Sequence, residues 1–297
     1  MNERKTSMVL SMVIFGSIGV FVRLIPMSSA AVACFRGICG ALFILGYSLL
    51  RGISFDRGRL KKNMKILFVS GAAIGANWIL LFEAYRYTSV AVATLCYYMQ
   101  PVFVILLSPF ITGEKLTAKR TVCVICSLAG MVLITGIASG SGIKASGIKG
   151  ILLGLGAAML YSAVIFLNKR LRDISDMEMT FFQLLYAGIA VMPYALVQRG
   201  FYAEGMGPLQ WLVLLCLGIV HTGWAYTLYF GAMKTLSAQT TALFSYIDPV
   251  CAILFSAALL KEPLTAQVVL GALLILAPTM LTEMAPSKKT GKDLGSS

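Results

Sequence analysis

Apolar segments of about 20 residues follow one another along almost the whole sequence. A helix of that length crosses the roughly 30 Å hydrocarbon layer of a bilayer. About ten such segments are present, near residues 7–25, 30–50, 66–85, 90–111, 120–138, 150–168, 178–197, 209–230, 237–260 and 264–283. The links between them are short and leave no room for a soluble domain. The sequence therefore predicts an all-α polytopic membrane protein whose chemistry takes place in or between its helices.

The distribution of charge predicts how these helices are oriented. The chain has 25 Lys and Arg against 12 Asp and Glu, a net charge of +13, which in a soluble protein would suggest a nucleic-acid partner. With the N-terminus in the cytoplasm, the links on the other side carry only five basic residues: Arg86, Lys144, Lys149, Arg199 and Lys261. This positive-inside pattern predicts both termini in the cytoplasm and an even number of spans. Removal of the first segment as a signal peptide would leave an odd number. A nucleic-acid partner is not expected.

The second half of the chain repeats the first. A shift of 148 positions brings Pro101 onto Pro249 and Tyr98 onto Tyr246. Each copy has about five segments, and an odd number makes the second copy cross the membrane in the opposite sense. Inverted repeats are typical of transporters that bind substrate near the midplane. We predict two inverted five-helix repeats over residues 1–139 and 150–284, joined by a Gly/Ser-rich linker and followed by a cytoplasmic tail, 285–297.

Paired motifs connect the chain to a known family. The segments QPVFVILLSPFITGEKLTA, from Gln100, and DPVCAILFSAALLKEPLTA, from Asp248, occupy equivalent places in the two copies, and FRG opens the second segment at Phe35. With the five-helix halves, they resemble the drug/metabolite transporter superfamily and its ten-helix EamA branch. The resemblance implies a carrier in the bacterial cytoplasmic membrane, often an exporter of small metabolites such as amino acids, or of toxic organic compounds. Lys115 departs from the pattern, since the second copy has Pro263 there.

A polar residue precedes a proline at the middle of both motif helices. Proline removes a backbone hydrogen bond, and a break in the helix at membrane depth needs protein, a polar side chain or water beside it. The alternative is that each proline only kinks a packed helix. Asp248 is a charge at a depth where insertion costs roughly 2.5–3.5 kcal/mol. It therefore has either a substrate or proton role or a structural role as a buried hydrogen-bonding residue. Gln100 holds the same position in the first copy.

The titratable and thiol side chains limit the other chemistry. His221 is the only histidine, so a multi-histidine metal site is excluded. Because histidine has an ordinary pKa of about 6.5, His221 could exchange protons during transport. The alternative is a structural role, with a neutral ring bonded to a backbone carbonyl. The seven cysteines all fall in apolar segments and are expected to act as small apolar residues, the pair Cys123 and Cys126 included. No metal or other cofactor is predicted.

Aromatic and basic residues complete the predicted site. Aromatic side chains at mid-depth can hold apolar, aromatic or cationic ligands, or can simply pack the helices. Arg36 is expected to face a cavity, where it could bind a carboxylate, and Arg23 to reach towards the membrane surface. The predicted substrate-binding residues are Trp78, Asn77, Tyr97, Tyr98, Gln100, Trp224, Tyr246 and Arg36, and the predicted proton-coupling residues are Asp248 and His221.

Together these features predict a secondary transporter that exports a small organic metabolite by alternating access. A facilitator or channel is the nearer alternative. An intramembrane enzyme would need a constellation of reactive groups that the sequence lacks. The absence of G-x-x-x-x-G-K-[ST] argues against direct use of ATP. The expected partners are a small-molecule substrate, protons and the lipid bilayer. Neither the substrate nor the oligomeric state follows from the sequence.

Overall fold

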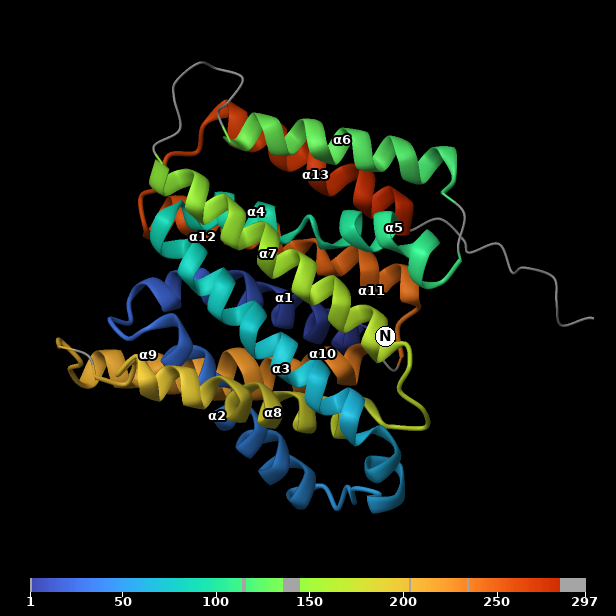
Figure 1. Cartoon of the computed structure of the whole chain (residues 1–297), viewed down its shortest axis with the longest axis vertical. Coiled ribbons are helices and arrows are strands. Elements are labelled where there is room, and N and C mark those ends of the chain that lie inside the picture. The colour runs from blue at the N-terminus through green and yellow to red at the C-terminus, as the bar shows by residue number, and fades with distance from the viewer. Residues whose placement is uncertain (1, 114–115, 136–144, 203, 234, 284–297) are drawn as a thin grey trace, which may run out of the picture.

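The computed structural model describes residues 2–113, 116–135, 145–202, 204–233 and 235–283, and within them every regular element is a helix (Figure 1). In chain order the elements are α1 (Asn2–Arg23), α2 (Ser29–Leu50), α3 (Arg57–Tyr87), α4 (Val90–Tyr97), α5 (Gln100–Ile111), α6 (Ala118–Thr135), α7 (Ala145–Asn168), α8 (Asp176–Val197), α9 (Pro208–Gly218), the π-helical turn η2 (Ile219–Trp224), α10 (Ala225–Met233), α11 (Ala238–Ser245), α12 (Ile247–Leu259) and α13 (Ala266–Glu283).

The helices fit the predicted spans. Among the described residues, eight helical segments are long and apolar enough to cross a membrane by length and composition. Leu243–Leu259 and Ala266–Thr282 are shorter apolar helices at the places of the last two predicted spans. The all-α fold is thus confirmed. Most of the predicted linker and the predicted tail, 285–297, lie outside the described residues.

Serine side chains begin four of the helices. The hydroxyl oxygens of Ser28, Ser89, Ser175 and Ser237 each accept a hydrogen bond from the backbone N–H three residues later, at the start of α2, α4, α8 and α11. The first turn of a helix has N–H groups without intrahelical partners, and an N-cap oxygen satisfies one of them. These serines therefore fix where the helices enter the bundle.

The two proline motifs interrupt their helices as the sequence predicts. The span over residues 90–111 ends its first helix at Tyr97 and starts its second at Gln100. In the second half, α11 ends at Ser245 and α12 begins at Ile247. The hydroxyl of Ser162 on α7 donates to the backbone carbonyl of Gln100 at 3.0 Å. The first break is thus bonded to a neighbouring helix, which membrane depth requires.

Glycines bring helices of the two halves into backbone contact. A Cβ on Gly37 of α2 would lie 2.8 Å from the backbone nitrogen of Gly188 on α8. A Cβ on Gly130 of α6 would lie 2.7 Å from the carbonyl oxygen of Gly271 on α13, and this pair runs side by side at the top of Figure 1. Small residues permit such close packing in membranes. The halves are therefore joined through α2 with α8 and α6 with α13.

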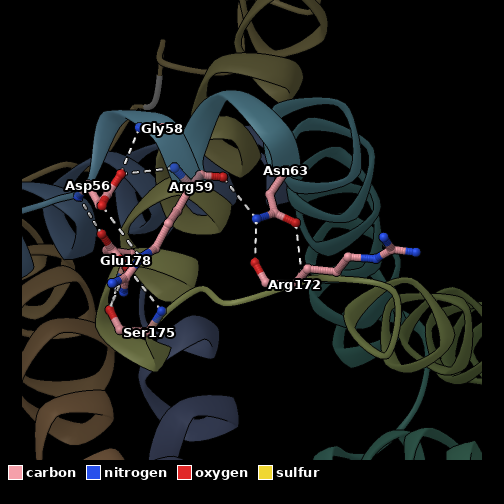
Figure 2. Close-up of polar contacts among 7 residues, drawn as sticks. All are labelled: Asp56, Gly58, Arg59, Asn63, Arg172, Ser175 and Glu178. Carbon is pink, nitrogen blue, oxygen red and sulfur yellow. Dashed lines mark hydrogen bonds and ion pairs between the residues drawn. The ribbon is translucent and has the colours of Figure 1, made fainter.

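A polar cluster joins two loops at one end of the bundle (Figure 2). Glu178 of α8 accepts from the backbone nitrogen of Asp56 at 2.7 Å and from that of Ser175 at 3.0 Å. The Asn63 amide of α3 donates to the carbonyl of Arg172 at 2.8 Å and accepts from its nitrogen at 3.0 Å. The α2–α3 loop and the start of α3 are thereby held against the α7–α8 loop.

Candidate functional site

A cavity of about 420 Å³ lies inside the bundle and is lined by both halves of the chain. Its walls come from α1, α2, α3, α4, α5, α7, α8, α10, α11 and α12 and from the two helix breaks. Sites for small molecules typically have 300–1,000 Å³ and a few polar groups in an otherwise apolar lining. This cavity has that size and that mixture.

Seven of the ten predicted site residues line the cavity: Arg36, Trp78, Tyr97, Tyr98, Gln100, Tyr246 and Asp248. They come from helices far apart in the sequence, so the fold brings together what the sequence analysis selected separately. A single ligand in this cavity can therefore contact side chains from both halves of the chain.

The other three predicted residues lie outside the cavity lining. Asn77 is buried and donates to the carbonyl of Ala157 at 2.5 Å, which joins α3 to α7. Trp224 is 42 % exposed on the outside of the bundle. His221 has Nε2 2.9 Å from the Ser17 hydroxyl and Nδ1 3.2 Å from the carbonyl of Cys216. Its surroundings match the alternative of a histidine bonded to a backbone carbonyl.

Arg36 is a buried cation held in a fixed orientation. Its side chain is 4 % exposed, and its Nε donates to Thr222 Oγ1 at 2.7 Å. The guanidinium carbon lies 4.4 Å from the centre of the Trp78 ring, within reach of a cation–π contact. None of the ion pairs formed by the described residues involves Arg36.

Thr222 owes its position to the π-helical turn. Its hydroxyl donates to the carbonyl of Leu217, five residues earlier, at 2.8 Å, and accepts from Arg36. A Cβ on Gly40 of α2 would lie 2.5 Å from Thr222 Cγ2, so the missing side chain lets η2 approach α2. π-helical turns inside α-helices are frequent at functional sites. Sequence analysis missed Thr222 because a threonine in an apolar helix is unremarkable there.

Asp248 connects the two helix breaks. Its Oδ2 accepts from the Tyr98 hydroxyl at 2.6 Å, across 150 positions of sequence. A Cβ on Gly16 of α1 would lie 2.6 Å from the backbone carbonyl oxygen of Asp248. The absence of a side chain at Gly16 therefore lets α12 pack closely against α1. Gln100 lines the same cavity, and its Oε1 is buried without a hydrogen-bond partner among the described residues.

Tyrosines form much of the remaining wall. The rings of Tyr97 and Tyr161 have centroids 5.8 Å apart, and Tyr226 stacks on Phe230 at 5.9 Å. All four line the cavity. Tyr161 was not predicted, although one signal was present, an isolated tyrosine in the middle of an apolar segment.

The cavity lining reaches one end of the bundle. Asn168 at the end of α7, Thr180 in the second turn of α8 and Met233 at the end of α10 all contribute to it. In the sequence, Asn168 and Thr180 flank Arg172, Ser175 and Glu178, which belong to the polar cluster of Figure 2. The lining therefore extends from the helix breaks towards that end.

Ionic contacts join the helices at the opposite end. Arg23, predicted to reach towards the membrane surface, forms an ion pair with Glu262 at 3.4 Å and donates to the carbonyl of Thr88 at 2.8 Å. Glu262 also accepts from the backbone nitrogen of Val90 at 3.0 Å, at the start of α4. The end of α1, the start of α4 and the α12–α13 loop are thus held together.

Known proteins identify the family. The EamA-like transporter family matches residues 6–136 and 148–284. The chain belongs to this family. Its sequence resemblance to EamA proteins is therefore confirmed, and the chain is a multi-pass membrane protein.

Individual relatives in known organisms carry transporter names. The chain is 30 % identical over 276 residues to the uncharacterized transporter YxxF of Bacillus subtilis, covering 93 % of this chain and 88 % of that one. It is 30 % identical over 283 residues to an uncharacterized transporter of Archaeoglobus fulgidus, covering 95 % and 96 %. The aromatic amino acid exporter YddG of Ancylobacter novellus is 26 % identical over 170 residues, covering 57 % and 58 %. These names point to transporters.

The fold is also shared with a protein of known crystal structure. The two chains superpose with a TM-score of 0.64 at 19 % sequence identity, over 95 % of this chain and 96 % of the other. The likeness supports the arrangement of helices around the cavity.

Proposed function

We propose that this EamA protein is a secondary transporter that exports a small organic metabolite, such as an amino acid or a related compound, by alternating access. The observation that carries the proposal is the cavity. In a chain whose family consists of transporters, it is lined by both halves, contains two charged side chains and lies beside two broken helices. Broken helices next to the substrate are a recurrent arrangement in secondary transporters. The exporter named among the relatives supports the outward direction.

Two inverted repeats, over residues 1–139 and 150–284, are the proposed moving parts. Matched local features support them. The N-caps Ser89 and Ser237 are 148 positions apart, and so are the polar residues at the two breaks, Gln100 and Asp248. Rocking of one repeat against the other would expose the cavity to each side of the membrane in turn.

The proposed location is the bacterial cytoplasmic membrane, with both termini in the cytoplasm. The basic residues support this orientation, because they concentrate in the links of one side. The cavity lining then reaches the cytoplasmic end, where an exporter would take up its substrate. Protons are the proposed coupling ion, with Asp248 as the first candidate group. His221 is the second candidate, although it lies outside the lining.

Transport by purified protein tests the proposal. Amino acids, nucleosides and organic cations are first screened for an increase in thermal stability, since a ligand that binds the folded state stabilises it. Ligands found in this way are then tested for saturable counterflow in proteoliposomes. Non-saturating flux without counterflow would instead identify a facilitator or channel. Equal transport with and without a pH gradient would exclude proton coupling.

Two tryptophans provide a matched pair of variants. Trp78 lines the cavity, whereas Trp224 lies on the outside. We expect Trp78→Ala to abolish the thermal shift and the counterflow, and Trp224→Ala to retain both. Retention of both by a folded Trp78→Ala protein would contradict the assignment of this cavity as the substrate site.

A further inference from the structure

The start of α3 carries a row of basic side chains on the outside of the bundle. Arg57, Lys61 and Lys65 are four residues apart, so they follow one another along one side of the helix, and all three are exposed. With its 31 residues α3 is about 46 Å long, whereas the hydrocarbon layer is about 30 Å thick. The predicted apolar span begins only at residue 66. The basic row therefore lies where this long helix leaves the apolar layer.

Aromatic rings lie on α3, on α8 and in the loop before α3. The ring centroids of Phe55 and Phe181 are 5.2 Å apart, and those of Phe181 and Phe182 are 4.9 Å apart. The series continues from Phe182 to Tyr186 at 5.9 Å, and from Tyr186 to Phe68 on α3 at 5.4 Å. None of these five rings is buried, and Phe68 is 46 % exposed. They form a continuous, partly exposed aromatic strip across α3 and α8.

Helical spacing places the basic row and the aromatic strip on the same side of α3. Lys61, Met64 and Phe68 are three and four residues apart, so they share one face, and Met64 is 48 % exposed. A Cβ on Gly71 would lie 2.7 Å from Tyr186 Cβ, so α8 approaches α3 beside this face. The surface thus changes from basic to apolar within two turns, as a bilayer does between its headgroups and its acyl chains.

The acidic residues of this end leave the basic row unpaired. Residues 56–65 and 169–178 hold eight basic and four acidic side chains, a net charge of +4. Asp56 forms an ion pair with Arg59 at 3.5 Å, and both line a polar hollow together with Lys62 and Asp173. Glu178 is buried and accepts from backbone N–H groups. None of the ion pairs formed within the described part of the chain involves the basic row.

Hydrogen bonds hold this surface in a fixed arrangement. The Asn63 side chain, at the start of α3, is bonded to both backbone groups of Arg172 in the α7–α8 loop (Figure 2). Glu178 of α8 holds the backbone nitrogen of Asp56, just before α3. The basic row is thus carried by an ordered helix start that is clamped to α8, beside the aromatic strip.

We propose that this surface of α3 and α8 binds an anionic phospholipid, with the lipid phosphate on Arg57, Lys61 and Lys65 and the acyl chains along Met64 and the aromatic strip. Clusters of Lys and Arg next to the cytoplasmic end of a transmembrane helix attract anionic headgroups. Charge alone would attract any anion, whereas the adjoining apolar strip favours an anion that carries acyl chains. None of these residues lines the central cavity, so the lipid site is separate from the substrate site.

Lipid titrations test the site. Purified full-length protein in a neutral detergent is titrated with phosphatidylglycerol, cardiolipin, phosphatidylcholine or inorganic phosphate, and its unfolding temperature is measured, since a ligand that binds the folded state stabilises it. We expect the two anionic lipids to raise the unfolding temperature more than phosphatidylcholine, and the excess to shrink towards about 1 M salt. Inorganic phosphate should have no effect. Equal effects of the anionic lipids and phosphatidylcholine, or of the anionic lipids and phosphate, would overturn the proposal.

A charge-matched pair of variants separates this site from general attraction to basic residues. Arg57→Gln, Lys61→Gln and Lys65→Gln, combined in one protein, should weaken binding of phosphatidylglycerol about tenfold or more. The control combines Arg4→Gln, Lys5→Gln and Lys119→Gln, three exposed residues of other links on the same predicted side, and should bind as the wild type does. Native mass spectrometry counts the lipids retained by each protein. Equal losses in the two variants would show that net charge alone attracts the lipid, and the site would be wrong.

A second pair of variants tests the apolar part. Phe68→Ala should weaken binding of phosphatidylglycerol and leave its salt dependence unchanged, because the basic row is intact. Phe110→Ala, at the 87 % exposed ring near the end of α5, is the control and should change neither. If Phe68→Ala retains as much lipid as the wild type, the acyl chains do not lie on the aromatic strip and the proposed site fails.

Discussion

At the residue scale, Asp56 offers a test of how the loops at one end of the bundle are held. The backbone N–H groups of Arg59 and Gly58 donate to its carboxylate and lower the pKa of that group below its ordinary value. A lowered pKa stabilises the fold above the unfolded-state pKa of about 3.9, and the contribution is lost as the pH falls through the folded-state pKa.

We therefore expect Asp56→Ala to lower the unfolding temperature at pH 7, and the difference from the wild type to shrink below about pH 4. Thermal unfolding in detergent between pH 7 and pH 3 measures it. Asp173→Asn, at an exposed neighbouring position, is the control and should show a small difference at every pH. A difference for Asp56→Ala that stays constant with pH would show that the charge of this N-cap is not involved.

Single residues also show what the sequence could and could not predict about the site. Asp248 was identified because a charge is costly at membrane depth and needs a reason, and Gln100 because it holds the equivalent position in the first copy. Arg36 was identified as a guanidinium that could bind a carboxylate. Trp78 and Trp224 have similar depth, but one faces the cavity and the other faces outward. Which face of a helix points inward depends on its neighbours, and a single sequence does not reveal them.

At the element scale, the local shape of a helix depends partly on close contacts with neighbouring helices, which the hydrophobicity of its sequence does not predict. The breaks near Pro101 and Pro249 followed from proline chemistry, and the structure confirms them. The π-helical turn did not follow from the sequence, because tertiary contacts stabilise the extra residue in such a turn. Here these contacts are the hydrogen bond from Thr222 to the carbonyl of Leu217 and the close approach of Gly40. Local sequence thus predicted the breaks, whereas tertiary packing decides the turn.

Glycine contacts between helices give a prediction with an internal control. A Cβ on Gly130 would lie 2.7 Å from the carbonyl oxygen of Gly271, whereas a Cβ on Gly46 of α2 would meet nothing within 4 Å. Gly130→Ala should therefore separate α6 from α13 and destabilise the protein by about 1–3 kcal/mol. Gly46→Ala should be neutral or stabilising, because alanine favours helix by up to about 1 kcal/mol over glycine. Unfolding temperatures compare the two, and equal effects would contradict the contact.

At the scale of the whole molecule, the two ends of the bundle differ. The cavity lining reaches the end that carries the polar cluster of Figure 2, while Arg23 and Glu262 hold the helices together at the other end. The sequence predicted the number and nature of the helices well, because membrane insertion depends on summed hydrophobicity. It could not predict which end the cavity lining reaches, since that depends on contacts between helices distant in sequence.

The orientation of the molecule is the last prediction, and one helix is sufficient to test it. Asp173 lies in the exposed loop before α8, and Glu204 is exposed after it. If α8 spans the membrane and the basic links are cytoplasmic, Asp173→Cys should react with a membrane-impermeant maleimide only in inside-out vesicles. Glu204→Cys should react only in right-side-out vesicles.

The native cysteines are replaced first, and labelling of both variants in detergent checks that each thiol is reactive. The reverse pattern would invert the proposed topology and make the cavity lining reach the outer surface. Reaction of both from one side would mean that α8 does not cross.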